Sequence, residues 1–405
     1  MLKGCRWQRL LLTLWLFLPA ISAASDKPIV LLVSIDGYRY DYLEKFKPNN
    51  LSIFMEDGAS VKGLIPSYPS LTFPNHYTMV TGLYPGQHGI IGNEFIDFAT
   101  NRRFSIYTEE KRKGSWYGGE PLWHGATRQG LIAASLFWPG SDADIQGHYP
   151  THYLPYDPKI NDAQRVAQVI AWLEMPDTSR PRFISVYFST VDHVGHKYGP
   201  DSPEMAEAVQ QIDESLKPLF DYINTSSLSI HTLIVSDHGM IQIGEQKPLC
   251  LTELVTIPDD VVITQQGPYV SIHGKTADMG QMAERLAGHT EFNTYLRQDI
   301  PTEWKFAQNP NSPDLLIEMK PPYMMKVHSA IADPIVKGAH GYNPFEIPQM
   351  QGILLAKGPK IQAGARLGLV ANIHVYALVT QLLGIEPATG VEACIGNLAP
   401  MLTFP

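Results

Sequence analysis

The chain has 405 residues, and its 40 acidic and 31 basic side chains give a formal net charge of −9 at neutral pH. Only 18% of the residues are charged and the balance is acidic, so a basic face that could hold a nucleic-acid polymer or an anionic membrane is not expected. The length exceeds that of most single domains but suits one large α/β domain with an insertion.

The first 24 residues are typical of a secretory signal peptide. Basic residues at Lys3, Arg6 and Arg9 precede an apolar stretch over about residues 10–21, and the small residues of AISAAS follow. This stretch is too short for a comfortable membrane span, and no later apolar run is longer. We therefore expect an exported protein, periplasmic or extracellular, without stable membrane insertion after cleavage. An uncleaved membrane anchor is the alternative.

Three apolar runs predict strands that are buried on both faces. The runs are IVLLVSI at 29–35, FISVYFSTV at 183–191 and TLIVS at 232–236. Continuous β-branched and aromatic runs of this length are typical of a parallel sheet that helices cover on both sides. In such sheets the functional groups gather beyond the carboxyl ends of the strands.

An aspartate stands at the end of each of these runs, and two of the three have a histidine close by. The aspartates are Asp36, Asp192 and Asp237, and the histidines are His196 and His238. Carboxylates beside imidazoles match the ligands of Zn²⁺ or a similar divalent cation. A single acid after a strand is more often a turn residue or a helix cap, but the joint pattern predicts a metal site.

Residues 66–95 predict a loop that leads into a helix. Their first part is dense in proline, serine, threonine and asparagine, and the more apolar residues 77–81 follow. Thr72 lies near the expected helix start, and Pro74 suits the first helical turn because proline has no N–H to lose. The helix dipole and the free N–H groups there favour an anion. A simple N-cap is the alternative role for Thr72.

Strand and helix patterns alternate along the rest of the chain. Further strands are expected at 131–137 and 352–356, and helices at 162–174 and 203–220. This alternation predicts a single catalytic domain over residues 25–405, of the α/β class, with a mostly parallel central sheet flanked by helices.

The pattern changes between about residues 250 and 334. Short strand-like pieces flank one helix-like segment at 277–287, which predicts a smaller insertion with a mixed or antiparallel sheet. Cys250 lies at the start of this insertion and Cys394 near the end of the chain. In an oxidising compartment the two could form one long-range disulfide, and two buried free thiols are the alternative.

Six motifs resemble the nucleotide pyrophosphatase/phosphodiesterase family of the alkaline phosphatase superfamily. In chain order they are VSIDGYR, SLTFPNHYTMVTGLYPGQHGIIGNEF, FWPGSD, VDHVGHKYGP, VSDHGM and GAHGYNP. The resemblance runs from Ile29 to about Gly384 and covers nearly the whole mature chain. It implies an alkaline phosphatase-like fold and a type I phosphodiesterase.

The resemblance also implies two zinc ions per chain. One ion would be held by Asp192, His196 and His340, and the other by Asp36, Asp237, His238 and the Thr72 oxygen. Only the resemblance points to His340, because GAHGYNP by itself is typical of a turn.

The same resemblance assigns roles in the chemistry. Thr72 would be the nucleophile and would form a covalent phospho-threonine diester, which water then resolves. Asn93 would donate to a phosphoryl oxygen, with a turn residue as the alternative role. Phe73 and Tyr156 would hold a nucleobase between two rings, and Asp142 would offer a polar contact. The alternative for both rings is a place in the apolar core.

We therefore expect an exported two-zinc phosphodiesterase that hydrolyses nucleotide phosphodiester and pyrophosphate bonds and releases a nucleoside monophosphate. A phosphomonoesterase of the same superfamily is disfavoured, because a monoester needs Arg or Lys beside phosphorus. Residues 130–147 contain neither, and the pattern around Arg102–Arg103 indicates an exposed turn. A lysophospholipid phosphodiesterase is a further candidate, and so is a non-catalytic zinc-binding protein, which would not need a hydroxyl at Thr72. The sequence leaves the leaving group, the base and the oligomeric state open.

Overall fold

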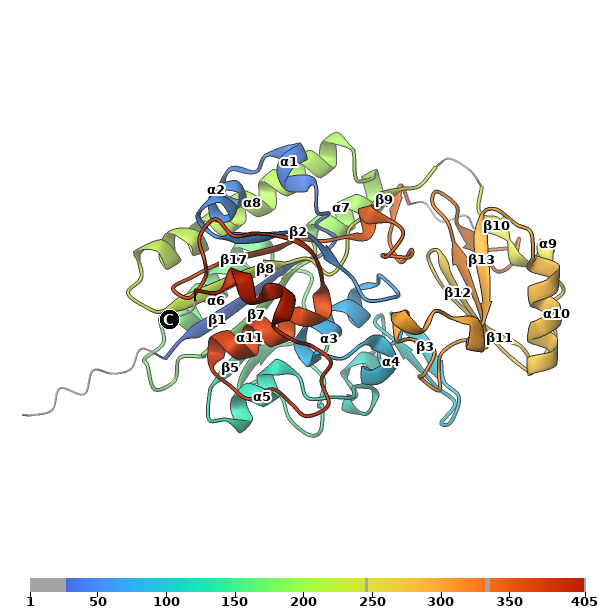
Figure 1. Ribbon diagram of the computed structural model, residues 1–405, viewed down its shortest axis with the longest axis horizontal. Helices are drawn as coiled ribbons and strands as arrows, with labels where there is room; N and C mark the ends of the chain where they lie inside the picture. The colour runs from blue at the N-terminus through green and yellow to red at the C-terminus, as the bar shows by residue number, and fades with distance from the viewer. Residues whose placement is uncertain (1–26, 245–246, 332–335, 404–405) are drawn as a thin grey trace, which may run out of the picture.

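The computed structural model describes residues 27–244, 247–331 and 336–403 (Figure 1). The predicted signal peptide lies outside the described residues. Within the described ranges, no helix combines the length and the apolar character that a membrane crossing requires.

The centre of the molecule is an eight-stranded sheet with the strand order β18-β2-β17-β8-β1-β7-β5-β6. Its strands are β1 (Ile29–Ile35), β2 (Ala59–Ile65), β5 (Ala133–Leu136), β6 (His152–Leu154), β7 (Phe183–Phe188), β8 (Ile230–Val235), β17 (Leu354–Lys357) and β18 (Arg366–Ala371). Only β17 runs antiparallel to its neighbours, and the other pairs in this sheet are parallel. The predicted α/β fold with a mostly parallel sheet is confirmed.

Helices cover both faces of this sheet because alternate residues of the central strand point in opposite directions. The helices are α1 (Tyr42–Phe46), α2 (Asn49–Asp57), α3 (Thr72–Thr81), α4 (Pro85–His88), α5 (Leu122–Arg128), α6 (Asp162–Leu173), α7 (Thr190–Tyr198), α8 (Pro203–Thr225), α9 (Leu251–Leu254), α10 (Thr276–Leu286) and α11 (Val375–Leu383). From β1, Val30 and Leu32 pack with α3, α5 and α11, whereas Leu31 and Val33 pack with α2, α6 and α8 (Figure 1).

A smaller antiparallel sheet forms the other end of the molecule (Figure 1). Its strand order is β11-β12-β14-β13, and α10 packs on it through Met279, Met282 and Leu286. The strands are β11 (Val262–Gln266), β12 (Tyr269–His273), β13 (Phe292–Leu296) and β14 (Leu315–Met319). We call the segment from 250 to 334 the insertion, since its small sheet has an apolar cluster of its own.

Short strand pairs complete the fold. They are β3 (Glu94–Asp97) with β4 (Arg102–Ser105), β9 (Ile241–Gln242) with β16 (Gly338–Ala339), and β10 (Leu249–Cys250) with β15 (Met325–Lys326). The β9–β16 pair holds the chain that follows β8 against the chain that leads to His340.

The structure corrects one strand boundary that matters for the site. The run at 183–191 was expected to be strand throughout, but β7 ends at Phe188 and α7 begins at Thr190. Asp192 and His196 therefore lie four residues apart on a helix, so their side chains share one face of it. Ser189 is the N-cap of α7 without a side-chain capping bond, and the Thr190 hydroxyl donates to Oδ2 of Asp162.

Cys250 and Cys394 are both free thiols in the structure. Cys250 is buried in the insertion, and Cys394 is exposed near the C-terminus. The long-range disulfide is therefore not formed. The alternative, two free thiols, holds, although only Cys250 is buried.

Candidate functional site

The chain after β1 and the chain after β8 bring two buried aspartates together. These strands are parallel neighbours in the sheet, so their carboxyl ends open at the same edge. Asp36 follows β1 directly, and Asp237 follows β8 after one residue. The backbone N–H of Gly37 donates to Oδ1 of Asp237 at 3.3 Å. Strand β7 lies on the other side of β1, and helix α7, which follows it, carries Asp192. His340 comes from the loop after β16.

One group of candidate ligands contains Asp36, Asp237 and His238. Their ligand atoms all lie within 4.8 Å of one another, and all three side chains are buried. Nε2 of His238 lies 3.4 Å from Oδ1 of Asp36 and 3.0 Å from Oδ2 of Asp237. The hydroxyl of Thr72 completes the group, with Oγ1 at 3.3 Å from the same Nε2.

A second group adjoins the first. Nε2 of His340 lies 3.1 Å from Nε2 of His196 and 3.7 Å from Oδ1 of Asp192. Nε2 of His196 lies 3.5 Å from the same carboxylate oxygen. The rings of His238 and His340 stack with their centroids 3.6 Å apart, so the two groups form one continuous centre.

All three histidines present the same ring nitrogen to the centre. Nδ1 of His196 faces the carbonyl of Gly338 at 3.0 Å, that of His238 faces Gly239 at 2.9 Å, and that of His340 faces Ser70 at 2.9 Å. A carbonyl only accepts hydrogen bonds, so each Nδ1 carries the proton. The lone pair of each neutral ring is then on Nε2, which is the arrangement of histidines that hold metals.

Carboxylate oxygens in the centre lack hydrogen-bond partners. Among the described residues, Oδ1 of Asp36, Oδ1 of Asp192 and Oδ2 of Asp237 are buried without one. Burial, followed by the nearby charges of Asp237 and Asp192, raises the pKa of Asp36 well above its usual value. Buried carboxylates are costly unless a cation or a donor satisfies them. Unpaired oxygens that face imidazole lone pairs therefore fit a site for divalent cations.

Thr72 is the first residue of α3, and its hydroxyl is not used as a cap. The N-cap is Leu71, which makes no side-chain capping bond. The role of simple N-cap is thereby excluded for Thr72. Its hydroxyl instead faces His238 at the positive end of the helix dipole, where an anion is stabilised.

Asn93 lies beside Thr72 in space although it is 21 residues away in sequence. Its Oδ1 accepts a hydrogen bond from the backbone N–H of Phe73 at 3.0 Å. The side-chain oxygen is therefore committed, and the two N–H donors of the amide are left for another partner. This geometry matches a donor to a phosphoryl oxygen.

Two further side chains lie against the aspartates, and sequence reasoning assigned neither of them a role at the site. The Tyr187 hydroxyl donates to Oδ2 of Asp36 at 2.5 Å. His76 lies one turn after Thr72 on α3, with Nδ1 at 2.9 Å from the Thr72 carbonyl and 3.4 Å from Oδ2 of Asp237. Tyr187 lies inside an apolar run, and His76 could be placed only by knowing which strand α3 covers.

The cavity beside this centre contains the predicted base-pocket residues. Its volume is about 920 Å³, and Phe73, Tyr156 and Asp142 all line it, together with Thr72 and Asn93. A cavity of this size is within the usual range for small-molecule sites. The Phe73 ring is half-buried and packs edge-on against Phe104, with 6.1 Å between centroids.

Charged residues in this cavity modify the sequence-based prediction. The carboxylate of Asp142 forms an ion pair with Arg112 at 3.0 Å, so it is already partly satisfied. Two cations, Lys111 and Arg165, also line the cavity, although a basic patch was not expected there. Arg165 is committed to the carbonyls of Ile160 and Tyr187, whereas Lys111 donates to a loop carbonyl.

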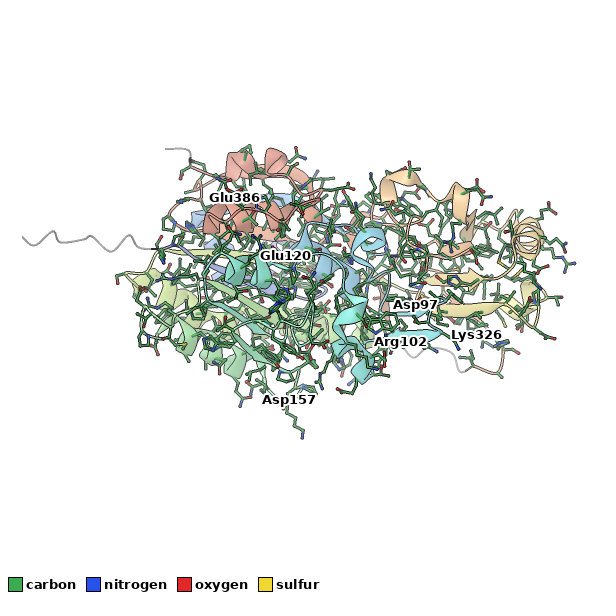
Figure 2. The ribbon with its side chains drawn as sticks, turned by 90° about the horizontal axis from the view of Figure 1, so that it is seen from below. Asp97, Arg102, Glu120, Asp157, Lys326 and Glu386 are labelled. Carbon is green, nitrogen blue, oxygen red and sulfur yellow. The ribbon has the colours of Figure 1, made fainter. Side chains whose placement is uncertain are left out.

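An exposed turn is formed by residues 98–101, as the pattern indicated, and Arg102 and Arg103 follow it directly. They open β4, and Figure 2 shows Arg102 close to Asp97 on the hairpin of β3 and β4, near the junction with the insertion. Arg102 pairs with Glu110 at 2.9 Å and Arg103 pairs with Glu94. Both guanidinium groups therefore have acidic partners on the protein itself.

Comparison with known proteins gives a consistent result. The family model described as type I phosphodiesterase/nucleotide pyrophosphatase matches residues 30–343. A venom phosphodiesterase of Crotalus durissus collilineatus is 34% identical over 400 residues, which cover 95% of this chain and 47% of that protein. Ectonucleotide pyrophosphatase/phosphodiesterase family member 3 of Rattus norvegicus is 32% identical over 401 residues, with coverages of 96% and 45%. The chain spans about half the length of the curated relatives it matches.

Solved structures show the same architecture. Murine ectonucleotide pyrophosphatase/phosphodiesterase 5, as an inactive variant in complex with AMP, superposes with a TM-score of 0.87 and 26% identity. The human protein of the same name superposes with the same TM-score and 29% identity. Both comparisons cover 93% of this chain and 100% of the neighbour.

Proposed function

The chain belongs to the type I phosphodiesterase/nucleotide pyrophosphatase family, and from this membership we propose that it is an exported two-zinc phosphodiesterase. It hydrolyses nucleotide phosphodiester and pyrophosphate bonds and releases a nucleoside monophosphate. The observation that carries the proposal is the position of the Thr72 hydroxyl, at a helix start and 3.3 Å from Nε2 of His238 in the candidate metal centre. Carboxylates and imidazoles suffice to store zinc, so a hydroxyl at a helix start beside them favours an enzyme.

The candidate ligands divide into two sets. Asp192, His196 and His340 hold one zinc ion, and Asp36, Asp237, His238 and the Thr72 oxygen hold the other. When bound, zinc lowers the pKa of a hydroxyl and neutralises charge that develops on oxygen. The unpaired carboxylate oxygens and the Nε2 lone pairs that face the centre support metal binding. His238 also lies within 4.8 Å of the ligand atoms of Asp192 and His340, so it stands between the two sets.

The residues of the chain then perform a two-step displacement. The Thr72 hydroxyl loses its proton and Oγ1 attacks phosphorus, which forms the phospho-threonine diester. The leaving-group oxygen departs with the electron pair of its bond to phosphorus. The Asn93 amide donates to a phosphoryl oxygen as charge increases there. Water breaks the Oγ1–phosphorus bond in the second step and frees the nucleoside monophosphate and Thr72. The inactive murine neighbour that binds AMP carries a threonine-to-alanine substitution, which supports a threonine nucleophile.

Nucleotide substrates are favoured over phosphomonoesters and lipids by the contents of the cavity. Aromatic rings at Phe73 and Tyr156 suit a base, and stacking tolerates every base. Monoesters carry an extra charge at phosphorus, but Arg102 and Arg103 are paired with acids elsewhere. Lys111 is the cavity cation that could pair with the extra charge of a monoester. It lies beside Tyr156, on the side of the cavity proposed for the base, and not beside phosphorus.

Substrate choice is tested by kcat/KM for a mononucleotide ester, a dinucleoside pyrophosphate, a simple phosphomonoester and a lysophospholipid. We expect the two nucleotide substrates to lead by at least about tenfold, since their bases gain roughly 1–3 kcal/mol from stacking. A higher value for the lysophospholipid or for the monoester would move the protein to that class of substrate.

Replacing Phe73 with alanine is expected to separate binding of the base from chemistry. The value of kcat/KM for nucleotide substrates should fall about 5- to 150-fold, which corresponds to a stacking energy of roughly 1–3 kcal/mol. A small aryl phosphodiester that has no base should be affected less, because it does not need this ring.

Phe104 provides the matched control for this substitution. It is fully buried against Phe73, so Phe104→Ala should lower the melting temperature and reduce activity on both substrates alike. If Phe73→Ala behaves like Phe104→Ala, with equal proportional losses on the two substrates, Phe73 is a core residue and does not stack on the base.

A further inference from the structure

A hairpin of the insertion reaches the loop that carries Asn93. The hairpin is formed by β11 and β12, and Gln266 is the last residue of β11. Oε1 of Gln266 accepts from the backbone N–H of Asn93 at 2.5 Å and from that of Glu94 at 3.0 Å, and its Nε2 donates to the Glu94 carbonyl at 2.6 Å. One side-chain amide thus makes three hydrogen bonds to the backbone of this loop.

Gly92 lets the side chain of Gln266 come close to the backbone of the loop. A Cβ atom on Gly92 would lie 2.5 Å from Nε2 of Gln266, so only glycine leaves room for the amide. The hairpin turns through Gly267 and Pro268, and Gly267 has the positive φ of 60° that a two-residue turn of this kind requires at its first position. Pro268 in turn lies against Gly341, next to the candidate ligand His340.

A chain of hydrogen bonds leads from this hairpin to the reacting group. Gln266 fixes the backbone of Asn93, and Oδ1 of Asn93 is held by the N–H of Phe73 beside the nucleophile. Because Gln266 holds the backbone of Asn93 and the Phe73 N–H holds its Oδ1, the side-chain NH₂ group is fixed in one direction. Donors aimed at a transition state lose most of their effect when they are displaced by a fraction of an ångström.

We propose that Gln266 is a positioning residue for this reaction: it holds Asn93 in the orientation that stabilises the phosphoryl oxygen in the transition state. This inference rests on the proposed function. The insertion therefore contributes to catalysis through one side chain, although none of the candidate zinc ligands and no nucleophile comes from it.

If Gln266 served only to dock the insertion on the main domain, its loss would undock the insertion. The structure separates this role from the positioning of Asn93. The insertion is anchored to the main domain by an aromatic cluster, in which Tyr68 stacks on Trp304 at 4.1 Å between centroids and contacts Tyr269 edge-on. This cluster does not involve Gln266. Loss of the Gln266 amide should therefore leave the insertion docked.

The test is Gln266→Met, which keeps the length of the side chain and removes its three hydrogen bonds. We expect kcat for a nucleotide diester to fall about 10- to 100-fold, the usual effect of losing a residue that orients a catalytic group, with KM within about twofold of the parent. The neighbour Gln265 is the matched control, because its amide bonds to Met325 within the insertion. Gln265→Met should leave kcat unchanged.

A double-mutant cycle with Asn93→Ala tests whether Gln266 acts through Asn93. If Gln266 acts through Asn93, adding Gln266→Met to Asn93→Ala should change kcat by less than about threefold. An undiminished drop in that background, or a Gln266→Met variant with the kcat of the parent, overturns the inference.

Binding of orthovanadate by calorimetry extends the cycle to variants whose turnover is too slow to measure. Vanadate offers equatorial oxygens like those of the transition state, so both single variants and the double variant should weaken it by the same factor. Separate, additive losses would contradict the inference. A parent protein that hydrolyses no phosphodiester with zinc supplied would instead remove the proposed function, whatever the variants show.

Discussion

Replacing Thr72 with alanine is expected to abolish most turnover while leaving the metal centre largely loaded. The substitution removes the only group proposed to bond to phosphorus, and loss of a nucleophile commonly costs on the order of 10⁴-fold or more in kcat. The three carboxylates and three imidazoles of the centre remain, so zinc content should stay near the parental value. Steady-state kinetics on a chromogenic phosphodiester, with metal analysis of the same sample, measure both quantities.

Thr72→Ser is the matched control for this prediction. Serine keeps a hydroxyl at the start of α3 and removes one methyl group, so measurable turnover should remain. Equal kcat values for Thr72→Ala and the parent would exclude Thr72 as the nucleophile. Loss of zinc from Thr72→Ala would show instead that the hydroxyl is needed chiefly to hold metal.

Replacing Asp237 with asparagine is expected to release about one zinc ion per chain. The substitution keeps the shape of the side chain but removes a formal charge from the group formed with Asp36 and His238. One carboxylate oxygen accepts from the Gly37 N–H, and the other faces His238 and His76. An asparagine whose side-chain oxygen keeps the hydrogen bond from the Gly37 N–H turns its NH₂ group toward the metal site. This group is a donor and cannot bind a cation. Metal analysis after dialysis against a weak chelator measures the effect.

Asp213 is the control for Asp237, because it is equally buried but lies on α8, where it accepts from the backbone N–H groups of Asn50 and Leu51. Asp213→Asn should lower the melting temperature and leave the zinc content unchanged. Full parental zinc in Asp237→Asn would contradict the assignment of this aspartate as a ligand.

The fold could be predicted where burial is continuous. The run at 29–35 coincides with β1 because all seven of its residues are buried and six of them are apolar, Ser34 being the exception. Strand β2 was missed although it lies inside the sheet, because Lys62 and Gly63 break its apolar run. The insertion was expected from its short strands, but the sequence does not show that its hairpin reaches Asn93.

The site could be predicted only in part, for a physical reason. Asp36 and Asp237 follow strands, so the topology of a parallel sheet places them together. His340 and Asn93 lie in loops, whose positions depend on contacts elsewhere in the chain, and only the resemblance pointed to them. Gln266 gave no signal at all, because its partners are more than 170 residues away in the sequence.

Removal and return of zinc tests the central claim most directly. The protein is treated with a chelator, dialysed, and titrated with zinc while hydrolysis of a chromogenic phosphodiester is followed. The two-ion account predicts that turnover disappears with the metal and returns in proportion to added zinc, reaching its maximum at two ions per chain. Turnover that survives complete removal of metal, or that is absent at every zinc level, would contradict it.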